Sequence, residues 1–598
     1  MTPPPQSSTV SGTVHHRIWQ QAQRAPDAVA VVDDDGAALT YRELTDRADA
    51  VARDLGWLDV ATEQVVGVCW PRSVDGLVRV LGVLRAGAAL LYLDPDWPEQ
   101  RLRHMTAACT VQLVLDRWYG LRVLDVQQPP AAAVLPMVHG PLCYAVFTSG
   151  STGTPKGVLV EHPGVLNMAV ELARIFRIGP GTTVLQFANW SWDAAMCEIL
   201  MTLTAGGTLM LAPPAVRGGG PGLAALLRRH AVNVVTLTPS VLDALPTADL
   251  PALRTVVAVG EPCHPALVAR WSTPDRQVFN GYGPTETTVA ATVAACTPGA
   301  DVHIGTPLPN VTTRVVDEHG HELVAGKAGE LLIGGIGVAR GYAGSVAATA
   351  ARFTTDGLGR RWYHTGDLVA RRPDGALDYV GRSDDQIKIR GHRIEFGEIE
   401  HVIAELPAVR SCAVTTVADQ LVAFVVAAGA DPVAGLSTGP AADPDHLPDL
   451  VLAHARTQLA AFAVPSTAIV VPALPLTGNG KLDRDALTAW AAARIAAPSA
   501  VAADAAPAAE ATLRMVLQVV SDVLGLPVGP GTDFIDAGGH SLLVAQLCVA
   551  LSETFGREVP YLTVAMNRTP AALAAAIDAT TGPVHPHPAI GGASSTRG

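Results

Sequence analysis

A strand-like apolar run at residues 142–147 leads directly into residues 148–157, which are rich in small and hydroxylated side chains. Such residues let backbone N–H groups and hydroxyls approach a phosphate closely, and Lys156 adds a positive charge. The segment differs from a Walker loop because Lys156 is followed by glycine, and no Gly-Lys-Ser/Thr occurs in the chain. A surface turn could have a similar composition, but the chain holds only four lysines and one lies here. The pattern therefore favours a phosphate-binding loop.

Further motifs follow in order along the chain. They are Leu39-Thr-Tyr-Arg-Glu-Leu44, Leu84-Arg-Ala-Gly to Asp94-Pro95, Tyr282-Gly-Pro-Thr-Glu286, Gly329-Glu-Leu-Leu-Ile to Ala339-Arg-Gly-Tyr342, Tyr363-His-Thr-Gly-Asp-Leu368, residues 381–400 from Gly-Arg-Ser-Asp-Asp-Gln to Gly-Glu-Ile-Glu, and Asn479-Gly-Lys-Leu-Asp-Arg484. One of them could occur by chance, whereas the ordered set could not. With the phosphate loop, the set resembles the adenylation domains of nonribosomal peptide synthetases, which are members of the adenylate-forming superfamily.

The resemblance implies an enzyme that joins an amino acid to ATP and releases pyrophosphate. The two reactants, the amino-acid carboxylate and ATP, are both anions, so cations and oriented hydrogen-bond donors are needed at the reacting phosphorus. The resemblance assigns phosphate handling to Thr148, Ser149, Thr152 and Lys156. It assigns Mg²⁺, a hard cation suited to oxygen ligands, to Glu286.

Other residues take their expected roles from the same resemblance. Thr285 would contact the α-phosphate, and Tyr282 would offer an aromatic face to adenine. Asp367 would accept hydrogen bonds from the ribose hydroxyls, with Arg382 beside it. Two further residues complete the set, Lys481 at the substrate carboxylate and Asp384 as the hinge of a smaller domain that swings between half-reactions.

A second short motif, Asp533-Phe-Ile-Asp-Ala-Gly-Gly-His-Ser541-Leu-Leu, resembles the phosphopantetheine attachment site of peptidyl carrier domains. Two glycines precede an expected helix that carries Leu543, Leu547 and Leu551, so Ser541 would lie at the helix start, where a phosphodiester is well tolerated. A hydrolase elbow of the Gly-x-Ser-x-Gly type is disfavoured, because Leu543 replaces the last glycine and no strand precedes. A helix-capping serine is the other alternative.

The amino-acid pocket can be located only by aligning the chain with the family's selectivity positions. Asp193 would pair with the α-ammonium group of the substrate, and the remaining wall would comprise Ala194, Cys197, Thr236, Val257, Val259, Gly281, Val289 and Ala290. No wall residue is charged, so a charged substrate side chain would be buried unpaired. Four wall residues, Ala194, Cys197, Gly281 and Ala290, are small and leave room for a large substrate side chain. The pattern favours a large neutral side chain, aromatic before aliphatic, with Thr236 as a hydroxyl partner. Trp192 departs from the usual Phe of this motif.

Alternating apolar runs and amphipathic stretches predict a wound α/β domain, with buried strands at residues 65–68, 112–115, 234–237 and 256–259. The expected organisation is an adenylation core at 12–383, a small α+β subdomain at 384–490, a linker at 491–509, a helical-bundle carrier domain at 510–580 and a disordered tail at 581–598. The linker is almost wholly Ala, Pro, Ser and Asp, which is typical of a tether.

Bulk composition limits the setting. A net charge of -13 argues against nucleic acid as a partner, and the scattered eight cysteines favour a reduced cytoplasmic location over a disulfide framework. The N-terminus lacks the pattern of a signal peptide, and the longest apolar run, residues 421–430, is too short for a membrane span.

Two rival functions stay open at this point. A CoA ligase of the same superfamily would deliver its product to free CoA, but Asp193 and the Ser541 motif argue against it. A non-catalytic carrier with a decayed adenylation domain should have lost Lys481, Glu286 or Asp367, and all three are present. The expected partners are an amino acid, a phosphopantetheinyl transferase and a downstream tailoring or condensation enzyme in trans, because the chain has no His-His-x-x-x-Asp-Gly motif. An MbtH-like helper protein is a further candidate partner.

Overall fold

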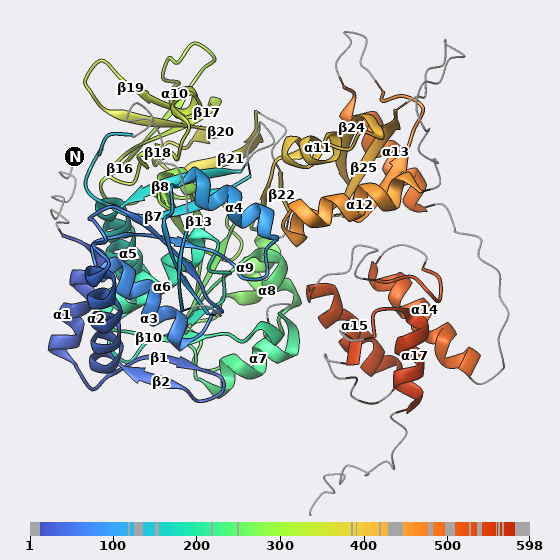
Figure 1. The fold of residues 1–598 in the computed structure, drawn as a ribbon, viewed down its shortest axis with the longest axis horizontal. Coiled ribbons are helices and arrows are strands. Elements are labelled where there is room, and N and C mark those ends of the chain that lie inside the picture. The colour runs from blue at the N-terminus through green and yellow to red at the C-terminus, as the bar shows by residue number, and fades with distance from the viewer. Residues whose placement is uncertain are drawn as a thin grey trace, which may run out of the picture. The chain divides into compact units, whose positions relative to one another are not determined.

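The computed structural model describes residues 12–117, 120–124, 135–149, 155–216, 219–247, 250–383, 387–389, 392–417, 420–428, 446–475, 482–496, 509–524, 528–534, 541–555, 557, 559, 563–564 and 567–579. Contacts divide the chain into two units, residues 1–492 and 493–598 (Figure 1). Three residues expected at the site, Thr152, Asp384 and Lys481, lie outside the described residues, as do most of the expected linker and the expected tail.

The first unit contains a nine-stranded sheet whose centre is parallel. Its strand order is β15 (Thr306–Pro307), β14 (Thr292–Cys296), β13 (Gln277–Tyr282), β12 (Thr255–Val259), β11 (Val234–Leu237), β9 (Thr183–Gln186), β10 (Thr208–Leu211), β1 (Val29–Asp33) and β2 (Ala38–Thr40). Strands β11, β12 and β13 pair in parallel, so their carboxyl ends lie at one edge of the sheet. That edge is where ligands bind in open α/β sheets.

A seven-stranded sheet carries the segment expected to bind phosphate. Its order is β18 (Gly341–Tyr342), β8 (Lys156–Glu161), β7 (Leu142–Thr148), β4 (Ala89–Tyr92), β3 (Val65–Cys69), β5 (Leu113–Asp116) and β6 (Gly120–Val123). Six of the seven residues of β7 are buried, because this strand lies inside the sheet and is covered on both faces.

Two helices, α5 (His162–Ile175) and α6 (Asp193–Ala205), lie between the two large sheets. Helix α5 contacts β7 and β8, α6 contacts β9 and β10, and the helices pack against each other. Both are apolar around most of their circumference, as expected for helices covered on all sides. The other helices of this region are α1 (Val14–Arg24), α2 (Tyr41–Trp57), α3 (Val74–Arg85), α4 (Glu99–Ala108), α7 (Gly220–Arg229), α8 (Pro239–Ala244), α9 (Pro265–Trp271) and α10 (Val346–Arg352).

The rest of the first unit consists of smaller sheets. A five-stranded sheet comprises β16 (Val311–Val316), β17 (Ala328–Gly335), β20 (Arg361–Arg371), β19 (Phe353–Thr355) and β21 (Leu377–Arg382). The C-terminal part contains the hairpin β22 (Ile387–Ile389) and β23 (His392–Ile394), the sheet β24 (Val409–Val417), β25 (Gln420–Ala427) and β26 (Thr467–Val470), and the helices α11 (Phe396–Ala404), α12 (Leu447–Gln458) and α13 (Arg484–Ala496).

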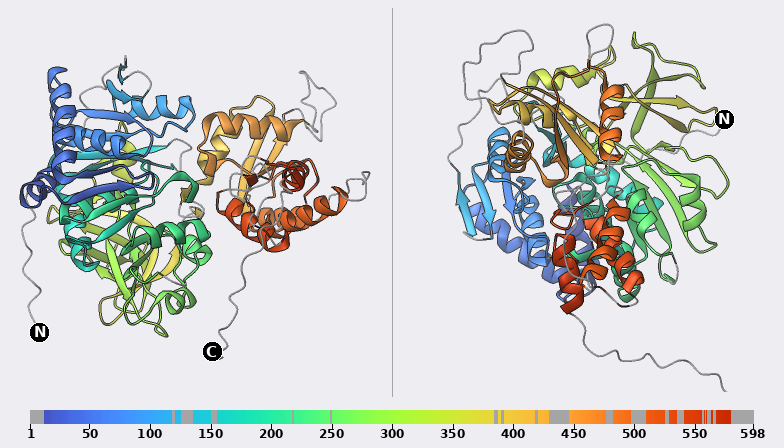
Figure 2. Two further views of the ribbon diagram at one scale, coloured as in Figure 1. Left: turned by 90° about the horizontal axis from the view of Figure 1, so that it is seen from below. Right: turned by 90° about the vertical axis from the view of Figure 1, so that its right-hand side faces the viewer.

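The second unit is helical where it is described. Helix α14 (Ala509–Leu524) contacts α15 (Ser541–Phe555) and α17 (Pro570–Ala579), and Figure 2 shows these helices in orange and red. Val516, Val520, Leu547 and Leu551 are fully buried and belong to one apolar core. Leu547 and Leu551 therefore face inward from α15, which is the helix that the sequence predicts to carry them.

The structure confirms the predicted fold class, an α/β core with a small α+β part and a separate helical unit. One boundary differs. Helix α13 continues to Ala496, six residues into the segment expected to be a linker, because an alanine-rich stretch favours continuation of a helix. Among the described helices, none has the length and apolar character that crossing a bilayer requires.

Candidate active site

The phosphate-loop residues lie at the facing ends of two antiparallel strands. Thr148 ends β7 directly opposite Lys156, which begins β8, and Ser149 follows Thr148. The Lys156 ammonium nitrogen lies 5.5 Å from the ring centroid of Tyr342, a residue of β18 in the same sheet. A cation over an aromatic face is held without losing its charge.

Tyr342 also connects this loop to the expected magnesium ligand. Its hydroxyl donates a 2.8 Å hydrogen bond to Oε1 of Glu286, which is 1% exposed and lies in the 3₁₀ helix Thr285–Thr287. No group of three potential metal-ligating side chains occurs among the described residues. Mg²⁺ typically takes one or two carboxylates and completes its shell with phosphate and water oxygens, so a single buried Glu286 near a phosphate loop fits this ion.

A second polar cluster surrounds Asp367 in β20. Its Oδ1 accepts a 2.7 Å hydrogen bond from Arg382 of the adjacent strand β21 and a 3.3 Å bond from the Tyr379 hydroxyl, and its Oδ2 accepts a 2.5 Å bond from the Tyr282 hydroxyl. Burial, with the Asp367 carboxylate second, raises the pKa of Tyr282 well above its ordinary value, so this phenol stays a donor. Three residues predicted from separate motifs thus meet here.

The strand register brings together the expected wall of the amino-acid pocket. Thr236 of β11 lies opposite Val257 of β12, and Val259 lies opposite Gly281 of β13. A Cβ placed on Gly281 would approach Val259 Cγ1 to 3.0 Å, so a larger residue at this position would press against its neighbour. Of the described residues, none offers a hydrogen-bond partner to the buried Thr236 hydroxyl.

Helix α6 supplies Asp193, its first residue, then Ala194 and, one turn later, the buried Cys197. The last two wall positions, Val289 and Ala290, lie in the turn that precedes β14. Val289 has a φ of +67°, which a β-branched residue rarely adopts. The adjacent turn is fixed by the Ala290 N–H, which donates to the Thr288 carbonyl oxygen at 2.7 Å. Backbone strain that is over-determined by its surroundings is typical of functional sites.

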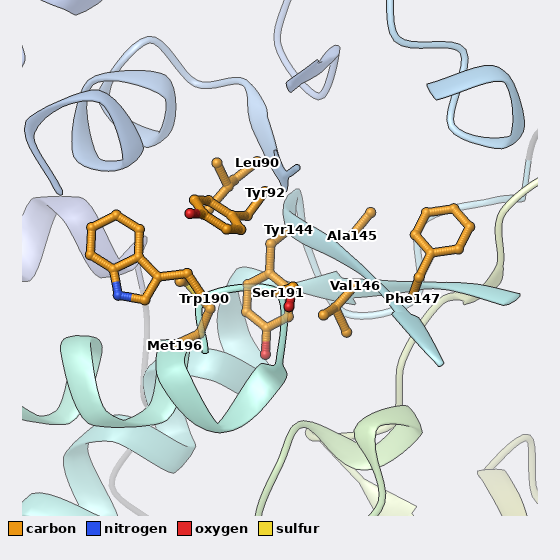
Figure 3. A pocket seen from close by; sticks show the side chains of 9 residues that line it. All are labelled: Leu90, Tyr92, Tyr144, Ala145, Val146, Phe147, Trp190, Ser191 and Met196. Atoms are coloured by element: carbon orange, nitrogen blue, oxygen red, sulfur yellow. The ribbon is translucent and has the colours of Figure 1, made fainter. Parts of the chain in front are cut away.

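A small cavity of about 10 Å³ lies beside the start of α6 (Figure 3). It is far too small for an amino acid. Tyr144 and Ser191 both line it, and neither buried hydroxyl has a hydrogen-bond partner among the described residues. Burial, and then the Asp193 carboxylate, raise the pKa of Tyr144 well above its ordinary value, so this phenol keeps its proton. The lining consists of Leu90, Tyr92, Tyr144, Ala145, Val146, Phe147, Trp190, Ser191 and Met196.

The C-terminal part of the first unit contacts the same region. The rings of Trp192 and His392 meet edge to face with centroids 4.0 Å apart, and His392 stacks on Phe462 at 3.7 Å. Farther away, Arg101 of α4 donates a 2.8 Å hydrogen bond to Glu398 of α11, and both side chains are 5% exposed. Trp192, which replaces the family's usual Phe, therefore contacts the C-terminal part of the first unit.

In the second unit, Ser541 is the first residue of the 15-residue helix α15. The helix is fixed from behind by Val544, Leu547 and Leu551, which are buried in the core of that unit. This location fits attachment of a prosthetic group, because the first turn of a helix leaves backbone N–H groups unsatisfied and favours a phosphate.

Sequence reasoning missed three polar residues of the site: Tyr144, Tyr342 and Tyr379. Tyr342 ends one of the recognised motifs, which was an available signal, and Tyr144 lies in the strand that feeds the phosphate loop. Nothing in the spacing of Tyr379 identifies a partner, because Asp367 lies 12 residues earlier on the neighbouring strand β20.

Three family models match the chain in sequence. Residues 18–343 match the AMP-binding enzyme model, residues 398–481 match the AMP-binding enzyme C-terminal domain, and residues 514–577 match the phosphopantetheine attachment site. The first match alone covers more than half of the chain. The three models follow one another in the same order as the structural regions described above.

Relatives with long alignments are peptide synthetases. A linear gramicidin synthase of Brevibacillus parabrevis is 37% identical over 583 residues, which cover 94% of this chain and 7% of that protein. Phosphinothricin tripeptide synthetase PhsC of Streptomyces viridochromogenes is 36% identical over 591 residues, which cover 95% of this chain and 53% of that protein. The chain therefore corresponds to only part of each relative.

A solved structure extends the likeness to both units. Holo-PA1221, described as an NRPS protein containing adenylation and PCP domains bound to a vinylsulfonamide inhibitor, is 27% identical with a TM-score of 0.77, and the match covers 95% of this chain and 96% of that one. The chain thus belongs to the AMP-binding, adenylate-forming enzymes and has the adenylation domain and phosphopantetheine-attachment domain of a nonribosomal peptide synthetase.

Proposed function

We propose that this protein activates a free amino acid with ATP, releasing pyrophosphate, and then loads the aminoacyl group onto its own carrier domain at Ser541. We further propose a large, neutral and preferably aromatic amino acid. The observation that carries the proposal is the combination of two buried polar clusters, around Glu286 and Asp367, with Asp193 at the start of a helix beside an uncharged wall.

The nucleotide end would act by binding and orientation. Asp367, already held by Arg382 and Tyr282, would exchange part of this bonding for the ribose hydroxyls. Lys156 would contribute a positive charge to the phosphates, and Glu286 would hold Mg²⁺. The ion, when bound, supplies charge stabilisation at the phosphate oxygens. The Lys156 charge and the bound ion would offset the repulsion between the substrate carboxylate and ATP.

The amino-acid end would act by selection. Asp193 would accept hydrogen bonds from the α-ammonium group, a charge-assisted contact that a simple carboxylic acid cannot make. The strands beyond it present Thr236, Val257 and Gly281, so a charged substrate side chain would find no partner there. The Thr236 hydroxyl has no hydrogen-bond partner among the residues that the structure describes, which supports an uncharged substrate side chain that carries a hydrogen-bonding group.

Phosphopantetheine, once attached, supplies the thiol that accepts the aminoacyl group. Its attachment to Ser541 would require a phosphopantetheinyl transferase, and the loaded product would require a downstream tailoring or condensation enzyme. An MbtH-like helper is a further candidate partner. The second unit is a helical domain with its own core, which supports recognition by separate enzymes.

The test is amino-acid-dependent ATP–pyrophosphate exchange by the purified protein, run over the proteinogenic set and modified aromatic amino acids, with and without an MbtH-like helper. We expect exchange with one large neutral amino acid. Intact-protein mass spectrometry should then show that amino acid on Ser541 of the phosphopantetheinylated protein and none on Ser541→Ala.

The outcomes separate the parts of the proposal. Exchange with a charged or very small amino acid would keep the enzyme class and overturn the substrate preference. Exchange without loading of Ser541, together with release of acyl-CoA when CoA is added, would indicate a CoA ligase instead. No exchange with any amino acid would favour either a decayed adenylation domain or an enzyme that activates an aryl acid, which has no α-ammonium group.

A further inference from the structure

Glu198 is a buried carboxylate in the middle of α6 that the proposed chemistry does not use. It is 0% exposed and lies five residues after Asp193 on the same helix. Its Oε2 accepts three hydrogen bonds, from Gln186 Nε2 at 2.9 Å, from the Phe187 N–H at 3.0 Å and from the Ala188 N–H at 3.1 Å. All three donors lie at the end of β9 or in the segment that follows it.

That segment, residues 187–192, leads directly into Asp193, and its hydrogen bonds continue from one residue to the next. Gln186 Oε1 accepts a 2.9 Å bond from the buried Trp190 indole N–H. The Asn189 carbonyl oxygen accepts a 2.9 Å bond from the Trp192 N–H. These bonds hold the segment at Trp190 and, separately, at Trp192, the residue immediately before Asp193.

Two other side chains hold the same segment from outside. Arg72 Nη1 donates a 2.7 Å hydrogen bond to the Phe187 carbonyl oxygen. Asn189 Nδ2 donates a 2.8 Å bond to Asp94, while its Oδ1 accepts from the Ser191 N–H at 3.2 Å. The bonds of Glu198 link Phe187 and Ala188 back to the helix that carries Asp193.

We propose that Glu198 is a positioning residue for amino-acid recognition: it ties residues 187–192 to α6 and thereby fixes the direction from which Asp193 meets the α-ammonium group. The inference rests on the role of Asp193 in the proposed function. Without Glu198, two backbone N–H groups and one amide would lose their shared buried acceptor, and the segment would have to move to satisfy them. A displacement of about 1 Å at a recognition group can cost roughly 100-fold in rate.

The proposed positioning role requires an acceptor oxygen at Glu198 but not a negative charge. Burial raises the pKa of Glu198 to about 8, although the hydrogen bonds from Gln186 and the backbone oppose this shift. One oxygen receives all three donors, and the other has no partner among the described residues. A glutamine could therefore present the same acceptor oxygen, whereas a leucine of similar length could not.

The test compares two substrates that differ only at the α-position, the activated amino acid and its 2-hydroxy acid counterpart. The ratio of their kcat/KM values in ATP–pyrophosphate exchange measures recognition of the ammonium group. We expect Glu198→Leu to lower this ratio at least about 10-fold, with the KM for ATP within about 2-fold of the parent value. Glu198→Gln should keep the ratio within about 3-fold.

Glu171→Leu is the matched control. Glu171 is also a buried glutamate, 5% exposed on the neighbouring helix α5, but its partner is Arg174 and it makes no bond to residues 187–192. The midpoint temperature of thermal unfolding should fall for both leucine variants, while the kcat/KM ratio of the two substrates should fall only for Glu198→Leu. An unchanged ratio in a folded Glu198→Leu protein, or an equal fall in Glu171→Leu, would overturn the positioning role.

Two further variants keep the test decisive. Should Glu198→Leu fail to fold, Arg72→Met loosens the same segment from a half-buried position and should lower the ratio to a smaller extent; an unchanged ratio would count against the proposal. Asp193→Ala separates the two levels of inference. If it leaves the ratio unchanged, the assumed role of Asp193 fails; if it lowers the ratio and Glu198→Leu does not, only the positioning role fails.

Discussion

The two ends of the proposed active site are built in different ways. At the nucleotide end, Asp367 receives three side-chain donors and Glu286 receives one, so the functional groups bind each other directly. At the amino-acid end, the wall is apolar or small, and its carboxylate Asp193 is placed from behind by Glu198 and a loop. ATP can be bound by fixed polar partners, whereas selection of a neutral amino acid needs only a shaped wall and one anchoring charge.

The largest expected effect lies at the nucleotide end. Glu286→Gln keeps the acceptor for Tyr342 but removes the negative charge that would hold Mg²⁺, so we expect kcat in pyrophosphate exchange to fall about 100- to 1,000-fold. The measurement is exchange at saturating ATP and amino acid over a magnesium titration. A kcat within a few-fold of the parent value would show that the charge of Glu286 is not needed at the nucleotide end.

Asp367→Asn should act on ATP alone. The amide cannot accept at both positions that Tyr282 and Arg382 occupy, and hydrogen bonds to a charged group are worth about 1.5–3 kcal/mol, so the KM for ATP should rise roughly 10- to 100-fold. The KM for the amino acid serves as the internal control and should stay within about 3-fold. Equal increases in both constants would contradict the separation of the two ends.

Gly281→Ala should act on the amino acid alone. The added methyl group would lie 3.0 Å from Val259 Cγ1 and narrow the wall, so kcat/KM for the preferred bulky amino acid should fall about 10-fold. The KM for ATP should not change, and a smaller neutral amino acid should lose less. An increase in the KM for ATP would indicate that Gly281 belongs to the nucleotide end of the site and would contradict the prediction.

The smallest expected effect concerns pH. Folded Glu198 holds its proton up to about pH 8, whereas in the unfolded chain it loses it near its ordinary value of 4.5. Its contribution to stability is therefore complete below pH 4.5 and is lost as the pH rises to 8, by about 1 kcal/mol between pH 6 and pH 7. Urea unfolding of Glu198→Gln should lack this part of the pH dependence. Parallel curves for parent and variant would refute the buried, protonated state.

Local patterns predicted most of the fold. Residues 234–237 form β11 as expected, since a short run of β-branched residues between turns is typical of a buried parallel strand. The linker was harder, because alanine-rich sequence is compatible both with a tether and with the end of α13. Sequence motifs identified Asp367 and Tyr282, but not their shared hydrogen bond, which depends on two strands from different sheets.

Glu198 illustrates why the rest could not be predicted. Helix α6 is apolar on nearly every side because it lies between two sheets, so a single glutamate within it has no face to indicate its partners. Its donors come from a segment 10 to 12 residues earlier in the chain, and only the packing of β9 on α6 brings them within hydrogen-bond distance.

Trp192 has a consequence for recombination between related synthetases. Its ring contacts His392, which stacks on Phe462, so the residue immediately before Asp193 packs against side chains that follow residue 384 in the chain. A chimera that exchanged only residues 12–383 for those of a relative with Phe at this position would place a smaller ring against His392 and Phe462. Exchanges that aim to transfer specificity should therefore carry Trp192, His392 and Phe462 together.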